Sequence, residues 1–228
     1  MDTRKIKIIG CGGIGSHLAE PLSRYLCYTK DRIEVTLIDG DDYEERNKER
    51  QQFTQFGNKA QVMASELRRK FPDILYKVLP EYITDHNVIS SIRERDEVFL
   101  CVDNHKTRKL ISKRCEELDN ILLISGGNEY TDGDVCIFAK KDGISAKKHN
   151  RPLTEIAPEI NFPQDINPGD YDGCAEMANV SPQLLFMNLT IAAIMCNCYY
   201  AFKQEKVNFE RVCVDIITQS SRAKPELY

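Results

Sequence analysis

Short apolar runs alternate with longer stretches of helical periodicity over the first half of the chain. The runs are almost continuous in Ile, Val, Leu and Phe, which is typical of strands buried on both faces of a parallel sheet. They lie at residues 6–9, 33–39, 74–79, 97–102 and 121–125. The helical segments between them lie at residues 16–26, 58–71, 87–92 and 106–118. This alternation predicts an α/β fold, with a doubly wound, mostly parallel sheet and helices on both faces.

The pattern changes towards the end of the chain. After a further apolar run at 134–139, residues 140–180 are rich in Pro, Asn, Asp and Gly, and so long a connection without periodicity is typical of a functional or disordered segment. Ser181-Pro182 then predicts the start of a helix that runs to about Phe202. This helix is apolar on most of its surface, so we expect it to be a core helix or to form a subunit interface. We expect the protein to be a homodimer. Residues 209–217 predict a last strand, and the polar tail from residue 220 is expected to be loose.

Composition narrows the functional classes. The net charge is −4, without the basic excess that nucleic-acid binding needs. No apolar run reaches 18 residues and the N-terminus does not resemble a signal peptide, so we expect a cytoplasmic protein that binds no membrane. The nine cysteines include no C-x-x-C pair. Several lie within apolar runs, which favours buried free thiols over metal ligands.

A glycine-rich turn follows the first strand and an acid ends the second. Gly10, Gly12, Gly13 and Gly15 lie between strand and helix, and Asp39 closes the next strand. Glycine lets main-chain N–H groups approach a phosphate, and the following helix directs its positive dipole end at the same point. A carboxylate at this distance is placed to bond ribose hydroxyls. The combination predicts a Rossmann-like site for an adenine nucleotide. The glycines alone do not distinguish NAD, FAD, S-adenosylmethionine and ATP, and they are also compatible with a packing turn.

The polar stretch after Asp39 distinguishes these nucleotides. It contains D-x-D at residues 39–41, N-x-x-R-Q at residues 47–51, and Lys59. Three later segments also carry motifs. Asp103-Asn104 with Arg108 and Ser125-Gly126-Gly127 lie at the ends of predicted strands, and Ser181-Pro182-Gln183 with Asn188 lies at the start of the predicted last helix. Together these motifs resemble the ThiF/MoeB superfamily, the adenylating fold shared with ubiquitin-activating enzymes. The resemblance covers nearly the whole chain, which we therefore interpret as a single adenylation domain (residues 1–228) with a crossover loop at 140–180.

The resemblance implies a role for each matching residue. Asp39 corresponds to the ribose ligand of an ATP site, Asp41 to a further nucleotide-binding residue, and Asp103 to the aspartate tied to Mg²⁺, with Asn104 beside it. The residues that resemble the phosphate-binding set are Asn47, Arg50, Gln51 and Lys59. Fixed cations and Mg²⁺ are what an attack on an α-phosphate requires, because positioning and electrostatic stabilisation supply most of the rate enhancement. A dehydrogenase would need no such cations beside its glycine turn.

The chain also departs from the family pattern. Lys59 follows Gly57 one residue sooner than the usual G-x-x-K, the first strand begins without a preceding helix, and the paired zinc cysteines are missing. The crossover loop contains one cysteine, Cys174. It resembles the acyl-accepting thiol of related enzymes, but its acidic neighbours Asp172 and Glu176 should raise its pKa, and a structural thiol is the alternative.

The sequence therefore predicts an ATP-dependent adenylyltransferase. We expect Mg²⁺ as cofactor, and catalytic roles for Arg50, Lys59, Asp103 and Cys174. The substrate implied by the resemblance is the C-terminal carboxylate of a small ubiquitin-like or sulfur-carrier protein or peptide that ends in glycine. Two alternatives stay open: a non-catalytic nucleotide-binding scaffold of the same family, and an NAD(P)-dependent oxidoreductase.

Overall fold

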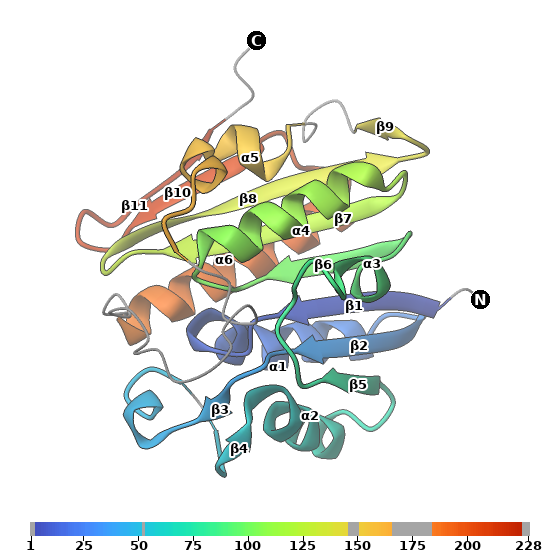
Figure 1. The fold of residues 1–228 in the computed structure, drawn as a ribbon, viewed down its shortest axis with the longest axis vertical. Helices are drawn as coiled ribbons and strands as arrows, with labels where there is room; N and C mark the ends of the chain where they lie inside the picture. Colours follow the sequence, from blue (N-terminus) through green and yellow to red (C-terminus); the bar gives the residue numbers. More distant parts are fainter. Residues whose placement is uncertain (1–2, 52, 146–150, 166–183, 225–228) are drawn as a thin grey trace.

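A mixed β-sheet crosses the whole molecule (Figure 1). The structure is a computed structural model and describes residues 3–51, 53–145, 151–165 and 184–224. Along the sheet the strands are β5 (Leu75–Leu79), β2 (Arg32–Ile38), β1 (Thr3–Ile9), β6 (Asp96–Leu100), β7 (Ile121–Asn128), β8 (Asp132–Lys141), β10 (Arg211–Asp215) and β11 (Ser220–Lys224). The strands from β5 to β7 are parallel to their neighbours, and those from β8 to β11 pair antiparallel. The short β9 (Ile144–Ser145) pairs with β8.

Helices cover both faces of this sheet. One face is packed by α1 (Gly13–Cys27), α2 (Lys59–Lys70) and α6 (Leu185–Lys203) around one buried apolar cluster. The other is packed by α3 (Val88–Ser91), α4 (His105–Glu117), α5 (Leu153–Ile156) and the 3-10 turn η2 (Pro158–Asn161) around a second. In Figure 1, α3, α4 and α5 lie in front of the sheet and α6 behind it. The predicted doubly wound α/β fold is confirmed.

The chain reverses direction across the sheet at β1 and β6. Helix α1 follows β1 on one face, whereas α4 follows β6 on the other, although the two strands are neighbours. Ligands of open α/β sheets bind in the crevice that such a reversal leaves at the carboxyl ends of the strands. A small hairpin of β3 (Asp42–Tyr43) and β4 (Gly57–Asn58), with the 3-10 turn η1 (Glu45–Asn47) between them, lies beside this crevice.

Two sequence expectations differ from the structure. Part of the segment expected to lack regular structure contains β9, α5 and η2; its remaining residues, 146–150 and 166–180, lie outside the described part of the chain. The expectation of a loose tail from residue 220 is wrong, because residues 220–224 form β11 against β10. Its side chains are mostly exposed, so the strand is formed by backbone pairing at the edge of the sheet, where polar residues are common.

Helix α6 is the most apolar helix that the structure describes. It is 19 residues long with a mean hydropathy of 1.4 in its most apolar window, so by length and composition alone it could cross a membrane. Its buried side lies against α1 and the sheet, with Met187, Ile191 and Met195 fully buried. This packing is that of a core helix, and its first residue, Leu185, reaches the cleft at the carboxyl ends of the strands.

Candidate functional site

A large cleft opens at the carboxyl ends of the strands. Its volume is about 1120 Å³, and its walls include the glycine turn, the end of β2, the residues after β6 and the strands β8, β10 and β11. Typical small-molecule pockets have volumes of about 300–1,000 Å³. The cleft therefore has room for a nucleotide and for part of a second ligand.

The glycine turn forms the floor of this cleft, and its glycines differ in how much space surrounds each of them. Gly10 has a φ of +89°, and a Cβ there would lie 2.9 Å from the Cys101 carbonyl. A Cβ on Gly15 would lie 1.9 Å from the Gly10 carbonyl oxygen, so the first turn of α1 packs directly on the strand end. Gly12 is different, because a Cβ there would meet only the Gln51 side-chain nitrogen, at 3.7 Å. Two glycines are thus required by packing, while Gly12 keeps space open beside the uncapped N-terminus of α1, which begins at Gly13.

Asp39 is buried at the end of β2. One carboxylate oxygen accepts the backbone N–H of Cys11 at 2.6 Å and the other accepts that of Asp41 at 2.8 Å. Burial raises its pKa to about 6, and the nearby Asp41 carboxylate adds to this rise, although Lys59 opposes it. The two N–H donors fix the side chain at the mouth of the crevice, and each carboxylate oxygen has a further lone pair for a ligand hydroxyl.

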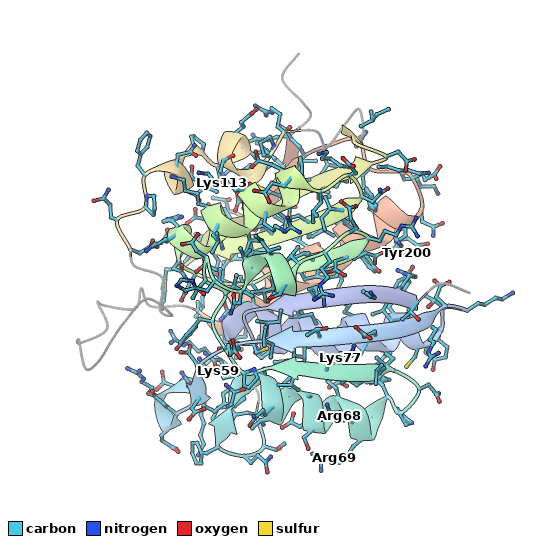
Figure 2. All side chains as sticks on the ribbon, turned by 45° about the vertical axis from the view of Figure 1, so that its right-hand side comes forward. Lys59, Arg68, Arg69, Lys77, Lys113 and Tyr200 are labelled. Atoms are coloured by element: carbon cyan, nitrogen blue, oxygen red, sulfur yellow. The ribbon has the colours of Figure 1, made fainter. Side chains whose placement is uncertain are left out.

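Lys59 is almost completely buried at the first turn of α2 (Figure 2). Its Nζ lies 2.9 Å from one carboxylate oxygen of Asp41. The other oxygen of Asp41 accepts the hydroxyl of Tyr82, whose ring packs against Gly40 so closely that a Cβ there would lie 2.6 Å from it. The backbone N–H of Lys59 and the side chain of Asn58 both donate to the Asp41 carbonyl. A buried lysine is therefore held at a defined point of the cleft wall.

Residues 47–51 place one cation and two amides at the edge of the same cleft. The Asn47 side chain accepts the backbone N–H of Glu44 at 2.8 Å, which closes η1. Within the described residues, Arg50 Nε and Gln51 Oε1 are buried atoms without a hydrogen-bond partner. The buried His17 ring contacts the Arg50 carbonyl at 3.3 Å, and burial lowers the pKa of His17, so it supports this loop as a neutral ring. Unpartnered polar atoms in a cleft indicate that a ligand completes the site.

The segment after β6 contributes an acidic side chain to the cleft and an arginine that hydrogen-bonds to the ends of two strands. Asp103 is exposed in the cleft wall, whereas Asn104 caps α4 by accepting the Thr107 N–H at 2.8 Å. The buried Arg108 donates to the carbonyls of Val102 and Gly126 at 2.9 and 2.6 Å and so joins the ends of β6 and β7. The structure thus gives Asn104 a capping role through Oδ1 and leaves Asp103 open to a cation.

The sequence prediction located most of this site but missed one residue. Among the predicted site residues that the structure describes, Gly15 does not line the cleft but packs beneath the glycine turn. The others all line it: Gly10, Gly12, Gly13, Asp39, Asp41, Asn47, Arg50, Gln51, Lys59, Asp103 and Asn104. Tyr82 was missed, because it follows β5 in a polar connection without periodicity. Cys174, like Ser181 and Gln183, lies outside the described residues.

The fold and the cleft together define a nucleotide-binding α/β domain. A glycine turn at a free helix N-terminus and an acid at the end of the second strand are the features of that class. The chain belongs to the ThiF family, whose model matches residues 1–221.

Curated relatives match about half of the chain. One is the tRNA threonylcarbamoyladenosine dehydratase of Haemophilus influenzae, 30% identical over 133 residues, which are 56% of this chain and 49% of that protein. Another is the ubiquitin-like modifier-activating enzyme 5 of Gallus gallus, 32% identical over 142 residues, 56% of this chain and 34% of the relative. The adenylyltransferase and sulfurtransferase MOCS3 of Drosophila sechellia is 29% identical over 60% of this chain and 30% of its own length. The chain spans half or less of the length of these relatives.

Solved structures share the fold across almost the whole chain. E. coli MccB in a crystal structure with ATP superimposes with a TM-score of 0.71 at 19% identity, covering 97% of this chain and 63% of that one. A crystal structure of PaaA superimposes with a TM-score of 0.66 at 16% identity, with coverage of 97% and 63%. At this level of identity the likeness establishes the fold.

Proposed function

We propose that this protein is an ATP-dependent adenylyltransferase, which joins a substrate carboxylate to AMP as an acyl-adenylate and releases pyrophosphate. The observation that carries the proposal is the buried Lys59 in the same cleft as the glycine turn and Asp103. A nicotinamide dinucleotide has no need of a buried cation at this place. The names of the relatives support the proposal, since two of them are an activating enzyme and an adenylyltransferase.

The residues of the cleft suit ATP and Mg²⁺. Gly12 leaves space for a phosphate beside the helix N-terminus, and the unpartnered Nε–H of Arg50 is at hand to donate to a phosphate oxygen, whereas the unpartnered Oε1 of Gln51 would accept from a ligand hydroxyl or a water molecule. Asp103 is an exposed carboxylate, the type of ligand that Mg²⁺ uses together with phosphate oxygens and water. When bound, Mg²⁺ would supply positive charge at the phosphates.

In this mechanism the protein positions and stabilises without supplying a nucleophile. Asp39 orients the ribose, and Arg50 and Lys59 stabilise the negative charge that grows on the phosphate oxygens as the substrate carboxylate attacks. Arginine supplies a planar fork of donors and lysine a compact point charge, and both suit this purpose. No thiol takes part in this displacement.

We further propose that the carboxylate is the C-terminus of a small ubiquitin-like or sulfur-carrier protein, or of a peptide, ending in glycine. The cleft volume of about 1120 Å³, with a wall that continues along β8, β10 and β11, supports an extended chain end as the second ligand. A tRNA substrate, suggested by the name of one relative, is less favoured, because the net charge of −4 opposes binding of a polyanion.

Calorimetry with ATP-Mg²⁺ and with NAD⁺ tests the nucleotide. We expect micromolar binding of ATP-Mg²⁺ and none of NAD⁺; the reverse result would refute the assignment and favour an oxidoreductase. Exchange of labelled pyrophosphate into ATP, with candidate carriers supplied, tests the chemistry. ATP binding without exchange for any carrier or peptide ending in Gly-Gly would favour the non-catalytic scaffold.

We also propose a homodimer. The outward side of α6 carries an apolar stripe at helical spacing, Phe186, Leu189 and Tyr200, and the exposed Tyr28 lies next to it at the end of α1. Such a stripe is unusual for a surface that meets only water, and a two-fold axis would pair it with itself. Sedimentation at tens of micromolar should give twice 26.1 kDa, and Leu189→Glu should give the monomer. A wild-type monomer would contradict the proposal.

We propose that Cys174, which lies outside the described residues, acts only after adenylation, when its thiol accepts the acyl group from the acyl-adenylate. Cys174→Ser should retain pyrophosphate exchange but lose any thioester to the carrier that reducing agent cleaves. If the wild type forms no such adduct, the acceptor takes the acyl group directly from AMP.

A further inference from the structure

The described part of the crossover loop, residues 151–165, forms a strap across helix α4. Its apolar side chains are buried in the cluster that α4 also packs into: Leu153, Ile156 and Ile160. Lys109 of α4 donates from Nζ to the carbonyl of Asn161 at 2.6 Å, and the Asn161 side chain donates to the carbonyl of Thr154 at 2.7 Å. The strap is therefore fixed to α4 by packing and by hydrogen bonds.

The strap reaches the N-terminus of α4, where the Asp165 carboxylate accepts two backbone N–H groups. One oxygen accepts that of His105 at 2.5 Å, and the other accepts that of Lys106 at 3.0 Å. Asn104 accepts the next one, from Thr107, at 2.8 Å. The first N–H groups of a helix have no partner within the helix, and the positive end of the helix dipole favours a carboxylate beside them. The local cap thus leaves two of these donors to a residue that is 60 positions away from His105 in the chain.

These N–H groups belong to the turn that follows Asp103. Asp103 is exposed in the cleft wall, so the position of its carboxylate depends mainly on the backbone that carries it. Arg108 joins the first turn of α4 to the ends of β6 and β7 through the carbonyls of Val102 and Gly126. Asp165 holds the same turn from a distant part of the chain. A carboxylate that binds a metal needs such support, because outer partners orient the groups that contact the ion.

We infer that Asp165 is a positioning residue, which holds the first turn of α4 and thereby keeps Asp103 in place for Mg²⁺ and the phosphates. This inference rests on the proposed function and adds a role for the strap to it. A simple N-cap is the alternative, in which Asp165 stabilises α4 without any effect on the metal. The two roles differ in what a substitution does to ligands that need the metal and to ligands that do not.

A double-mutant cycle with Asp103 tests the inference. Calorimetry gives the Kd for ATP-Mg²⁺ of wild type, Asp165→Ala, Asp103→Ala and the double variant. We expect Asp165→Ala to raise this Kd about tenfold, since outer partners of metal-binding groups typically contribute about 10- to 100-fold in affinity. In the Asp103→Ala background the same change should alter the Kd by less than about twofold, because the effects of residues that act through one another do not add.

The controls are one ligand and two variants. AMP without a divalent metal needs no ion at Asp103, so Asp165→Ala should change its Kd by less than about twofold. Glu159→Ala removes the same charge from an exposed side chain of the strap in the wall of the same cleft, and it should leave the Kd for ATP-Mg²⁺ within about twofold of wild type. Asp165→Asn keeps one acceptor oxygen and should give a Kd between those of wild type and Asp165→Ala. Circular dichroism confirms that each variant is folded; if Asp165→Ala is not, the cycle is run with Asp165→Asn.

The possible outcomes separate this inference from the proposed function. An unchanged Kd for ATP-Mg²⁺ in Asp165→Ala, an equal loss for AMP, an equal effect of Glu159→Ala or additive effects in the cycle would each overturn the inference. In all of these cases wild type still binds ATP-Mg²⁺, so the proposed function stands and Asp165 is only a cap. If wild type itself does not bind ATP-Mg²⁺, the proposed function fails first and the inference falls with it.

Discussion

Two glycines of the same turn should respond in opposite ways to the same substitution. Gly12→Ala places a methyl group in open space, with only the Gln51 side chain at 3.7 Å, and the φ of −80° lies outside the left-handed region. Gly15→Ala places it 1.9 Å from the carbonyl oxygen of Gly10, which is backbone and cannot turn away. The first change should affect the ligand, and the second the fold.

The magnitudes follow from these contacts. Overpacking against fixed atoms costs about 1–3 kcal/mol or more, and for a chain of this size each kcal/mol lowers Tm by about 2–4 °C. A contact at 1.9 Å lies at the severe end of that range, about 3 kcal/mol, so we expect Gly15→Ala to lower Tm by about 6–12 °C. Gly12→Ala should lower Tm by about 2–4 °C, because a poorer N-cap costs about 1 kcal/mol. Its methyl group stands where a phosphate would approach, so the Kd for ATP-Mg²⁺ should rise about tenfold or more.

Thermal unfolding and calorimetry on the two variants decide the matter. The reasoning is refuted at Gly12 if the folded Gly12→Ala protein binds ATP-Mg²⁺ as tightly as wild type, because the turn would then serve packing alone. It is refuted at Gly15 if Gly15→Ala unfolds at the wild-type temperature, since α1 could not then lie as close to β1 as described.

Three further predictions concern the cleft wall. Lys59→Ala and Asp103→Ala should each reduce pyrophosphate exchange by on the order of 10²-fold or more while circular dichroism stays unchanged; near-normal exchange would mean that the phosphate site lies elsewhere. Hydroxyl donors favour the ionised form of Asp39, whose pKa burial raises to about 6, so adenosine affinity should fall as the pH drops through 6. Adenosine is chosen because it has no phosphate to titrate, and a flat profile from pH 5 to 8 would contradict this role. Tyr82→Phe should lower kcat/KM for ATP about tenfold, whereas Tyr130→Phe, at the other side of the cleft, should not.

Local patterns were sufficient to predict which residues meet at one end of the cleft. The strand, the turn at Gly10 to Gly15, the helix and Asp39 are close in sequence, so spacing alone fixes their relative positions. The carboxyl ends of parallel strands must share one edge of the sheet, which also brings Asp103 to the same cleft. These placements needed no knowledge of side-chain contacts.

Contacts that depend on pairing between distant segments could not be predicted in this way. Tyr82 reaches Asp41 because β5 pairs with β2, with Leu79 opposite Ile38, so the residues after both strands meet. Strand β11 has a polar sequence with little β-propensity, and it forms because the turn tied by Asp215 returns the chain along β10. In both cases the signal lies in register, which the periodicity of a single segment does not contain.

The ion pair of Lys59 with Asp41 is compatible with a role for the lysine at phosphate. An ammonium group has three donors, and the contact with Asp41 at 2.9 Å uses one of them. Tyr82 donates to the other oxygen of Asp41 and so helps to keep that carboxylate in place. Burial restricts the rotamers of Lys59, so little ordering of this side chain remains to be done when charge develops in the cleft. Stabilisation by fixed groups is greatest when they need no reorganisation at the moment of reaction. Under the proposed function, Asp41 therefore acts on the phosphates through the lysine that it holds.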